Sequence, residues 1–212
     1  MDIQSSLLTS QVLLAWRSHV FVAAPTLETE RLILRMATPN DAPAILTYYQ
    51  ENHAFLTTVE PTRSPGFYTL EFWQEQVEKA MLEFNYEQSL KLCLFDRSQP
   101  TRLIGKANVH QMVRGVSQSC VLGYSLAERE QGKGYMGEAL QTVIHWLFVQ
   151  QNFHRITANY MPRNQRSGNL LRRLGFVVEG YARDYLMING KWEDHILTSL
   201  TNPQWRNPEF GE

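Results

Sequence analysis

Three closely spaced glycines that follow an apolar, strand-like segment limit the fold more than any other feature of this chain. Residues Arg129–Gly137 read REQGKGYMG, and an amphipathic stretch over about 133–150 follows. The first backbone N–H groups of a helix have no partner inside the helix, and the helix dipole favours negative charge there. Glycines let such a backbone approach an anion closely. We therefore expect a phosphate or pyrophosphate site here, although a plain strand-to-helix turn would use the same glycines.

The same glycines also match the GxGxxG fingerprint of dinucleotide-binding proteins. That fold uses an acidic residue about 20 positions onward to hold the ribose. Here no Asp or Glu lies between Glu138 and Glu179, and only 212 − 137 = 75 residues follow Gly137. This remainder is too short to complete a doubly wound sheet, so a nicotinamide-dependent oxidoreductase is disfavoured.

The acid-free interval concentrates positive charge in a chain whose net charge is only −1. Such a local field suits a polyanionic ligand beside the glycine segment, or a nucleic-acid surface. A solvated helix face is the simpler explanation for the last two arginines of the set. The charged side chains between Ala139 and Val178 are Arg155, Arg163, Arg166, Arg172 and Arg173.

Length and composition predict one globular domain with short terminal segments. The chain has 212 residues, of which 43% are hydrophobic and 19% charged, so a disordered, collagen-like or coiled-coil chain is excluded. No apolar run reaches about 18 residues, so we expect no membrane span. We expect an N-terminal extension over 1–24, the domain over 25–205 and a polar tail over 206–212.

The two cysteines, Cys93 and Cys120, do not form a CxxC pair. They are too few for a disulfide scaffold or a thiolate zinc site, which fits a reducing cytosol and a cytoplasmic protein. We expect no metal, because the sequence has no HExxH motif and no clustered carboxylates. The near-zero net charge gives no indication of DNA binding.

Hydrophobic periodicity predicts helices and strands that mix without a strict βαβ alternation. Asn189-Gly190 lies between two apolar runs and is a strong hairpin signal. The order indicates an α+β fold with a mixed, mostly antiparallel sheet flanked by helices. The expected strands are 31–36, 90–95, 103–112, 120–126, 154–160, 176–188 and 192–200, with a link over 96–102, and the expected helices are about 40–52, 69–86, 133–150 and 164–174.

Two motifs in this order resemble the GNAT N-acyltransferase superfamily. Arg129–Gly134 fits its Q/R-x-x-G-x-G/A motif, and Asn164–Phe176 fits N-x-x-S-x-x-x-L-x-x-L-G-F. Within that superfamily the chain is similar, over about 20–205, to the RimJ/RimL type of ribosomal-protein N-terminal alanine acetyltransferases. Leu27–Leu32 looks like the opening strand of this type, and the segments that look closest to the RimJ branch are Val113–Gly115, Ala158–Pro162 and Glu179–Tyr185.

The resemblance implies a sheet with two splayed central strands and acetyl-CoA between them. The pantetheine arm would lie along Val121–Leu126, and the pyrophosphate on the amides of Gln131–Gly137. Without the resemblance, Asn164 is simply an N-cap and Ser167 a first-turn residue. The expected cofactor-binding residues are Leu122, Tyr124, Leu126, Arg129, Gln131, Gly132, Lys133, Gly134, Tyr135, Met136, Gly137, Asn164, Ser167 and Arg172.

Acetyl transfer to an amine requires a neutral amine, a stabilised oxyanion and a protonated leaving thiolate. An α-amine has a pKa of about 7.7–8.0 against about 10.4 for lysine, so an N-terminal acceptor needs only a weak base or an ordered water. For the acid we favour Tyr185, with Ser167 as the rival donor. Backbone N–H groups near 122–124 would stabilise the oxyanion.

Two residues are candidates for the base, and each has an ordinary alternative role. Glu60 lies in a Pro-flanked loop that should border the acceptor, but it also fits a solvated loop acid. His110 lies on a central strand and also fits a strand histidine with satisfied hydrogen bonds. Asn108, on the same strand face as His110, would position the acceptor peptide.

The expected partner is a protein N-terminus, and the family resemblance implies a ribosomal protein and ribosome association. Two alternatives stay open at this point: a small amine such as a polyamine or an antibiotic, and a ribosome- or RNA-binding module that uses the arginine-rich interval. A monomer and a homodimer are equally compatible with the sequence.

Overall fold

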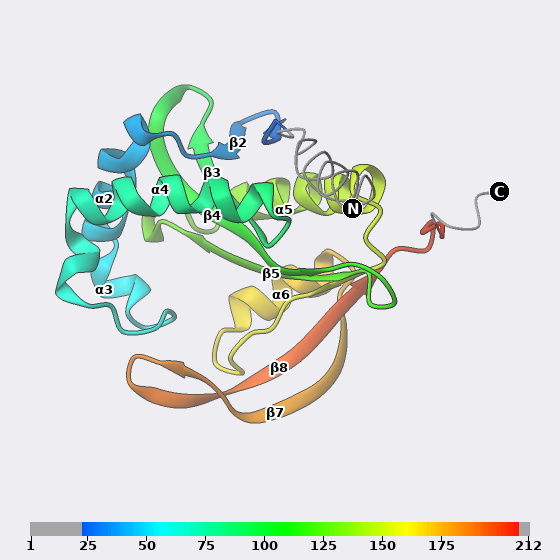
Figure 1. Cartoon of the computed structure of the whole chain (residues 1–212). Helices are drawn as coiled ribbons and strands as arrows, with labels where there is room; N and C mark the ends of the chain where they lie inside the picture. Colours follow the sequence, from blue (N-terminus) through cyan, green and yellow to red (C-terminus); the bar gives the residue numbers. More distant parts are fainter. Residues whose placement is uncertain (1–22, 208–212) are drawn as a thin grey trace, which may run out of the picture.

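The computed structural model describes residues 23–207, so the expected extension over 1–24 and the end of the tail lie largely outside the described residues (Figure 1). One eight-stranded sheet has the order β1-β2-β3-β4-β5-β6-β8-β7. All neighbours are antiparallel except β5 and β6, which are parallel, so the expected α+β class with a mostly antiparallel sheet is confirmed. The strands are β1 (Thr26–Glu28), β2 (Leu32–Met36), β3 (Ser89–Asp96), β4 (Gln99–Val113), β5 (Ser119–Leu126), β6 (Arg155–Thr157), β7 (Val177–Ile188) and β8 (Lys191–Thr201).

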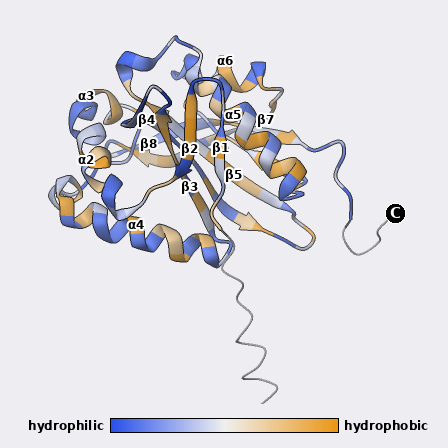
Figure 2. Cartoon of the chain, turned by 90° about the horizontal axis from the view of Figure 1, so that it is seen from above, coloured by the Kyte–Doolittle hydropathy of each residue, from blue (hydrophilic) through white to orange (hydrophobic). Residues whose placement is uncertain are grey.

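Helices cover both faces of the sheet. Seen from above, the sheet lies between α4 on one side and α5 on the other, with hydrophobic residues along the strands and on strips of the helices (Figure 2). The helices are η1 (Pro39–Asp41), α2 (Ala42–Glu51), α3 (His53–Leu56), η2 (Pro65–Tyr68), α4 (Leu70–Asn85), η3 (Glu128–Glu130), α5 (Tyr135–His145), the π-helical turn η4 (Trp146–Gln150) and α6 (Gln165–Arg173).

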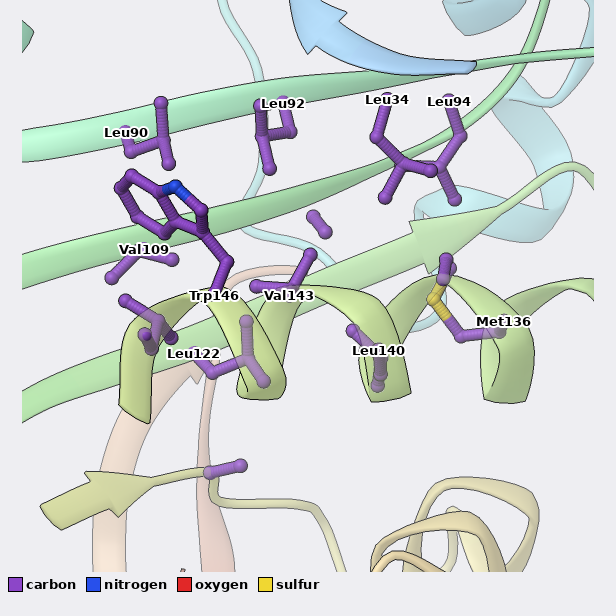
Figure 3. Close-up of a cluster of buried hydrophobic side chains, with 14 of the residues drawn as sticks. Leu34, Leu90, Leu92, Leu94, Val109, Leu122, Met136, Leu140, Val143 and Trp146 are labelled. Atoms are coloured by element: carbon purple, nitrogen blue, oxygen red, sulfur yellow. The ribbon is translucent and has the colours of Figure 1, made fainter. Parts of the chain in front are cut away.

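The larger core lies between the sheet and α5. Leu90, Leu92 and Leu94 alternate along β3 and are fully buried. They point toward Leu140 and Val143 on the apolar stripe of α5 (Figure 3). Each such side chain contributes about 2 kcal/mol by leaving water. A smaller aromatic cluster fills the opposite face, under α2 and α4.

Local sequence signals define most of the element ends. Thr69 caps α4 by accepting a hydrogen bond from the N–H of Phe72 at 3.3 Å. Gly175 follows α6 with a φ of 89°, the left-handed conformation that favours glycine after a helix. The Asn189-Gly190 turn has φ values of 47° and 73°, as a type I′ hairpin requires.

Three boundaries differ from the expectation. β4 begins at Gln99, so Pro100 lies at the start of a strand, where the β3–β4 register is irregular, and not in a longer link. The helix expected over 133–150 begins at Tyr135 and ends in the π-helical turn. The strand expected over 154–160 is only three residues long as β6, because the chain diverges from β5 after Thr157. It pairs with β8 again only at the isolated bridge between Tyr160 and Ile196.

The short parallel contact opens the centre of the sheet. β5 and β6 pair only where Ser119–Val121 lie beside Arg155–Thr157. From Leu122 to Leu126, β5 has no strand partner on that side among the described residues. A strand edge inside the sheet is therefore open. None of the helices described over 23–207 combines the length and apolar character needed to span a bilayer.

Candidate active site

A hydroxyl pair crosses the opening between β5 and α6. Tyr124 projects from β5 and its hydroxyl lies 2.7 Å from the Oγ of Ser167, in the first turn of α6. Asn164 caps that turn, since its Oδ1 accepts from the N–H of Ser167 at 3.2 Å. Burial raises the pKa of Tyr124 to about 12, although the hydrogen bond with Ser167 opposes the shift. Three predicted cofactor-binding residues thus meet at the open strand edge.

The glycine segment between η3 and α5 presents free backbone donors. Gly132 and Gly134 have φ values of 77° and 86°, and a Cβ built on Gly132 would meet no atom within 4 Å. Among residues 23–207, the N–H groups from Gly132 to Gly137 donate to no other residue. Open donors at the start of α5 fit a phosphate or pyrophosphate group.

Side chains fix this segment from outside without filling it. Arg31 donates to the carbonyl of Lys133 at 2.9 Å and lies against Gly134. Glu130 is buried and receives hydrogen bonds from Arg102 and Lys133. Burial opposes the charge of Glu130, but these two partners outweigh it and lower the pKa of its carboxyl group. Contacts at Lys133 and Glu130 therefore hold the loop conformation, while the space beside Gly132 stays open.

The remaining predicted cofactor residues take different places. Leu122 and Leu126 are buried on the α5 side of β5, and the side chain of Met136 points into the core, so only its main chain faces the loop. Arg166, on α6, donates to the side-chain carbonyl of Gln131. Three further side chains stay exposed or half-exposed around the loop: Arg129 (paired with Glu51), Tyr135 (under the Arg31 guanidinium) and Arg172 (bonded to Asn169).

The predicted acceptor residues lie on the other face of the sheet. Asn108 and His110 alternate with buried Ala107 and Val109, whose side chains belong to the core around α5. Asn108 pairs with Gly123 in the β4–β5 register, beside the open stretch of β5. The His110 ring is exposed overall, yet partial burial lowers its pKa, so the neutral imidazole is favoured.

Glu60 is ion-paired on both carboxylate oxygens. One oxygen lies 3.0 Å from the Nζ of Lys106 and the other 2.8 Å from Arg63. Burial opposes the charge, but Lys106 and Arg63 lower the pKa of Glu60. Lys106 also donates to the hydroxyl of Tyr49. This carboxylate is held as an anion and is a weak proton acceptor.

Tyr185 contacts residues other than Tyr124 and Ser167. It follows Asp184 in an irregular part of the β7–β8 register, and 41% of its surface is exposed. Its hydroxyl accepts from the Nδ2 of Asn159 at 3.2 Å, and its ring tilts over His195 at 5.3 Å. Neither contact reaches β5 or α6.

Sequence reasoning missed two connections. Lys106 interrupts an apolar strand, and that single charge was the available signal for the Glu60 pair. Arg163 bonds to Thr58 and Glu193, which nothing in the local sequence indicates. No group of three His, Cys, Asp or Glu side chains within the described part of the chain is arranged to hold a metal ion.

A family model described as "Acetyltransferase (GNAT) domain" matches residues 31–177. The chain belongs to the GNAT acetyltransferase family. The match includes the glycine segment, both splayed strands and α6, and it confirms the membership that the two sequence motifs predicted.

Curated relatives of this GNAT acetyltransferase cover nearly the same length. The [Ribosomal protein uS5]-alanine N-acetyltransferase of Escherichia coli (strain K12) is 46% identical over 180 residues, which span 84% of this chain and 92% of that protein. The probable N-acetyltransferase YjcK of Bacillus subtilis (strain 168) is 33% identical over 177 residues, which span 84% and 97%.

Solved structures agree with the fold. The ribosomal-protein-S5-alanine acetyltransferase from Vibrio fischeri has a TM-score of 0.82 at 37% identity, covering 86% of this chain and all of that one (100%). Mycobacterium smegmatis RimJ, in complex with CoA-disulfide, has a TM-score of 0.78 at 22% identity, covering 89% and 91%. The latter supports the fold alone.

Proposed function

We propose that this GNAT acetyltransferase transfers the acetyl group of acetyl-CoA to the N-terminal α-amine of a ribosomal protein that begins with alanine. The relatives named for ribosomal protein uS5 or S5 support the acceptor. The observation that carries the proposal is the open edge of β5 beside unpaired amides at Gly132–Gly137. We expect the protein to work in the cytoplasm, with the ribosome as its surroundings.

The residues around the opening fit acetyl-CoA. The amides of Gly132–Gly137 would hold the pyrophosphate, with Arg129, Lys133 and Arg166 supplying positive charge nearby. The free edge of β5 would hydrogen-bond the amides of the pantetheine arm as an added strand would. The co-substrate supplies an activated acetyl thioester, and the protein supplies orientation and proton transfer.

The hydroxyl pair is the proposed proton source for the leaving thiolate. The amine nitrogen forms a bond to the acetyl carbon, the C–S bond breaks, and the thiolate takes a proton. Ser167 stands at the opening with its hydroxyl bonded to Tyr124, so we assign it this role as a relay: Ser167 gives a proton to the thiolate as it takes one from Tyr124, which then recovers a proton from solvent. Tyr185, which contacts Asn159 and His195, is the alternative donor. Backbone N–H groups around Leu122–Tyr124 would stabilise the oxyanion.

Deprotonation of the acceptor requires little from the protein. An α-ammonium with a pKa near 8 loses its proton readily at neutral pH. Burial lowers the pKa of His110 and favours its neutral imidazole, which lies beside Gly123, so a water held there would accept the proton. Glu60, already paired with Lys106 and Arg63, is the weaker candidate base. Asn108 lies on β4 between His110 and Lys106, the partner of Glu60, and would orient the acceptor backbone.

Calorimetry with acetyl-CoA and mass spectrometry of acceptor peptides test this proposal. We expect saturable binding of acetyl-CoA and addition of one acetyl group to the α-amine of peptides that begin with alanine. Acetylation of a polyamine or another small amine, with all peptides left unmodified, would replace the acceptor but keep the enzyme class. Absence of binding at millimolar acetyl-CoA would refute the proposal. Light scattering of the same sample would distinguish a monomer from a homodimer.

A further inference from the structure

Arg163 connects three segments that are far apart in sequence. Its Nη1 donates to the carbonyl of Thr58 at 3.0 Å, and its Nη2 donates to the carboxylate of Glu193 at 2.9 Å. Thr58 follows α3, Arg163 precedes α6, and Glu193 lies on β8. A planar guanidinium can bind two acceptors at a fixed separation, which a lysine cannot do in the same way.

The loop over 57–64 is held from its other side as well. Glu60 is bound by Lys106, which projects from the centre of β4. The loop therefore has two anchors, one on the strand that carries the predicted acceptor residues and one on the segment that leads into α6. Arg163 stands one residue before Asn164, the cap of the turn that holds Ser167.

A small pocket lies behind this loop. It measures about 70 Å³, and its wall includes both the loop and the end of α2. The position of the loop sets the shape of this pocket, because residues from Thr57 to Arg63 form much of its lining. Beyond the loop, the lining includes Tyr49, His53 and Tyr68.

We propose that Arg163 is a positioning residue for the polypeptide acceptor. Its hydrogen bonds hold the loop over 57–64 against the N-terminal end of α6 and against β8. They thereby fix the position of the pocket wall relative to Ser167. The role rests on the proposed function, in which α6 faces the co-substrate and the pocket side faces the acceptor. Arg163 acts through the loop and does not touch the reacting atoms.

Arg97 offers a matched control at the far edge of the sheet. It donates to the carbonyl of Thr29 at 2.8 Å and pairs with Glu28 at 3.1 Å, so it repeats the carbonyl-plus-carboxylate arrangement of Arg163. The exposed fractions of the two arginine side chains are nearly equal, 50% for Arg97 and 49% for Arg163. A general effect of losing one such arginine would appear in both variants.

The experiment compares Arg163→Ala, Arg163→Lys and Arg97→Ala in steady-state kinetics and in amide hydrogen exchange. For Arg163→Ala we expect the KM for an N-terminal peptide to rise about fivefold to tenfold, as loss of one exposed ion pair and one hydrogen bond allows. Amide exchange over 57–64 should rise with it, while acetyl-CoA affinity stays within about twofold. Arg163→Lys keeps the charge but not the fork, so it should restore less than half of either effect.

Each other outcome overturns the proposal. Equal KM and exchange in Arg163→Ala and Arg97→Ala would show that Arg163 does not hold the loop. A raised KM without faster exchange would make Arg163 a direct acceptor contact, and faster exchange with an unchanged KM would make it purely structural. If the wild-type protein acetylates no peptide, the proposed function fails separately, and the exchange measurement still decides whether Arg163 holds the loop.

Discussion

At the residue scale, the candidate site contains two clusters with different chemistry on opposite faces of one sheet. Tyr124 and Ser167 share a neutral hydroxyl pair at the open edge of β5. Glu60 and Lys106 form a charged pair on the acceptor side. The hydroxyl pair can donate a proton, whereas the charged pair is fully compensated and serves to fix the loop.

Ser167→Ala tests the hydroxyl pair. We expect kcat to fall about 100-fold, because the thiolate loses its proton donor, while the affinity for acetyl-CoA changes little. The cap from Asn164 uses the backbone N–H of Ser167, so the variant should keep α6 and its melting temperature. Steady-state kinetics of this variant and of Tyr185→Phe decides between the two donors. A larger loss of kcat in Tyr185→Phe would show that Tyr185, on β7, is the acid.

The pH dependence of stability tests the charged pair. Lys106 and Arg63 lower the pKa of Glu60 below its ordinary value, so the pair stabilises the fold above about pH 4.3, the unfolded-state value. That contribution is lost as the pH falls through the folded-state pKa. Urea unfolding should show the wild type about 2 kcal/mol more stable than Glu60→Gln at pH 7. The difference should vanish in strong acid, and an equal difference at every pH would contradict this assignment.

At the scale of elements, the strand–loop–helix unit from β5 to α5 carries the most specific signal of the chain. Its glycines have left-handed φ values that other residues adopt only at a cost of about 1–2 kcal/mol. The open donors and the short β5–β6 contact then place an anion site and a free strand edge in succession.

Gly132→Val should separate conformational cost from ligand binding. Gly115 is the control, since it also has a positive φ, 66° against 77°, and open space around a Cβ. Both valine variants should lose about 1–2 kcal/mol in unfolding free energy. Only Gly132→Val should weaken acetyl-CoA binding, by at least about tenfold in calorimetry. Equal affinities in the two variants would remove the glycine segment from the co-substrate site.

Element ends and faces could be predicted where short-range chemistry sets them. Thr69 and Asn164 begin their helices as caps, and Asn189-Gly190 closes a hairpin. The separation of β5 from β6 follows from contacts across the whole sheet, so only the family resemblance indicated it. The same holds for Arg163, whose partners lie 105 and 30 residues away in sequence.

The predicted site residues divide in the same way. Asn164, Ser167 and Tyr124 meet at one place, because one motif puts two of them on the same helical turn and the strand alternation aims the third toward it. Periodicity places Asn108 and His110 on a common face but does not specify what faces them. The ion pairing of Glu60 depends on Lys106, 46 residues later by 106 − 60, and no local pattern shows it.

At the scale of the whole molecule, the sheet consists of two parts joined at a narrow contact. β1–β5 form one part and β6, β8 and β7 the other, and three residue pairs connect them through β5 and β6. Each part carries half of the candidate site. Tyr124 lies on β5 in the first part, and the glycine segment follows that strand in sequence. Ser167 lies on α6, which comes between β6 and β7 of the second part in sequence.

Acetyl-CoA should therefore stabilise the junction more than either part. A ligand that binds only the folded protein adds about 2.7 kcal/mol at 100 times its Kd. Because the ligand would bridge β5 and α6, we expect the largest gain in amide protection over 119–126, 132–137 and 155–168, and little over β1 and α4. Hydrogen exchange with and without acetyl-CoA measures this directly. A ligand that contacts both parts must dissociate before the amides of either part can exchange, so it protects both sides of the opening. Uniform protection along the chain, or protection confined to one part, would therefore mean that the ligand does not lie across the opening.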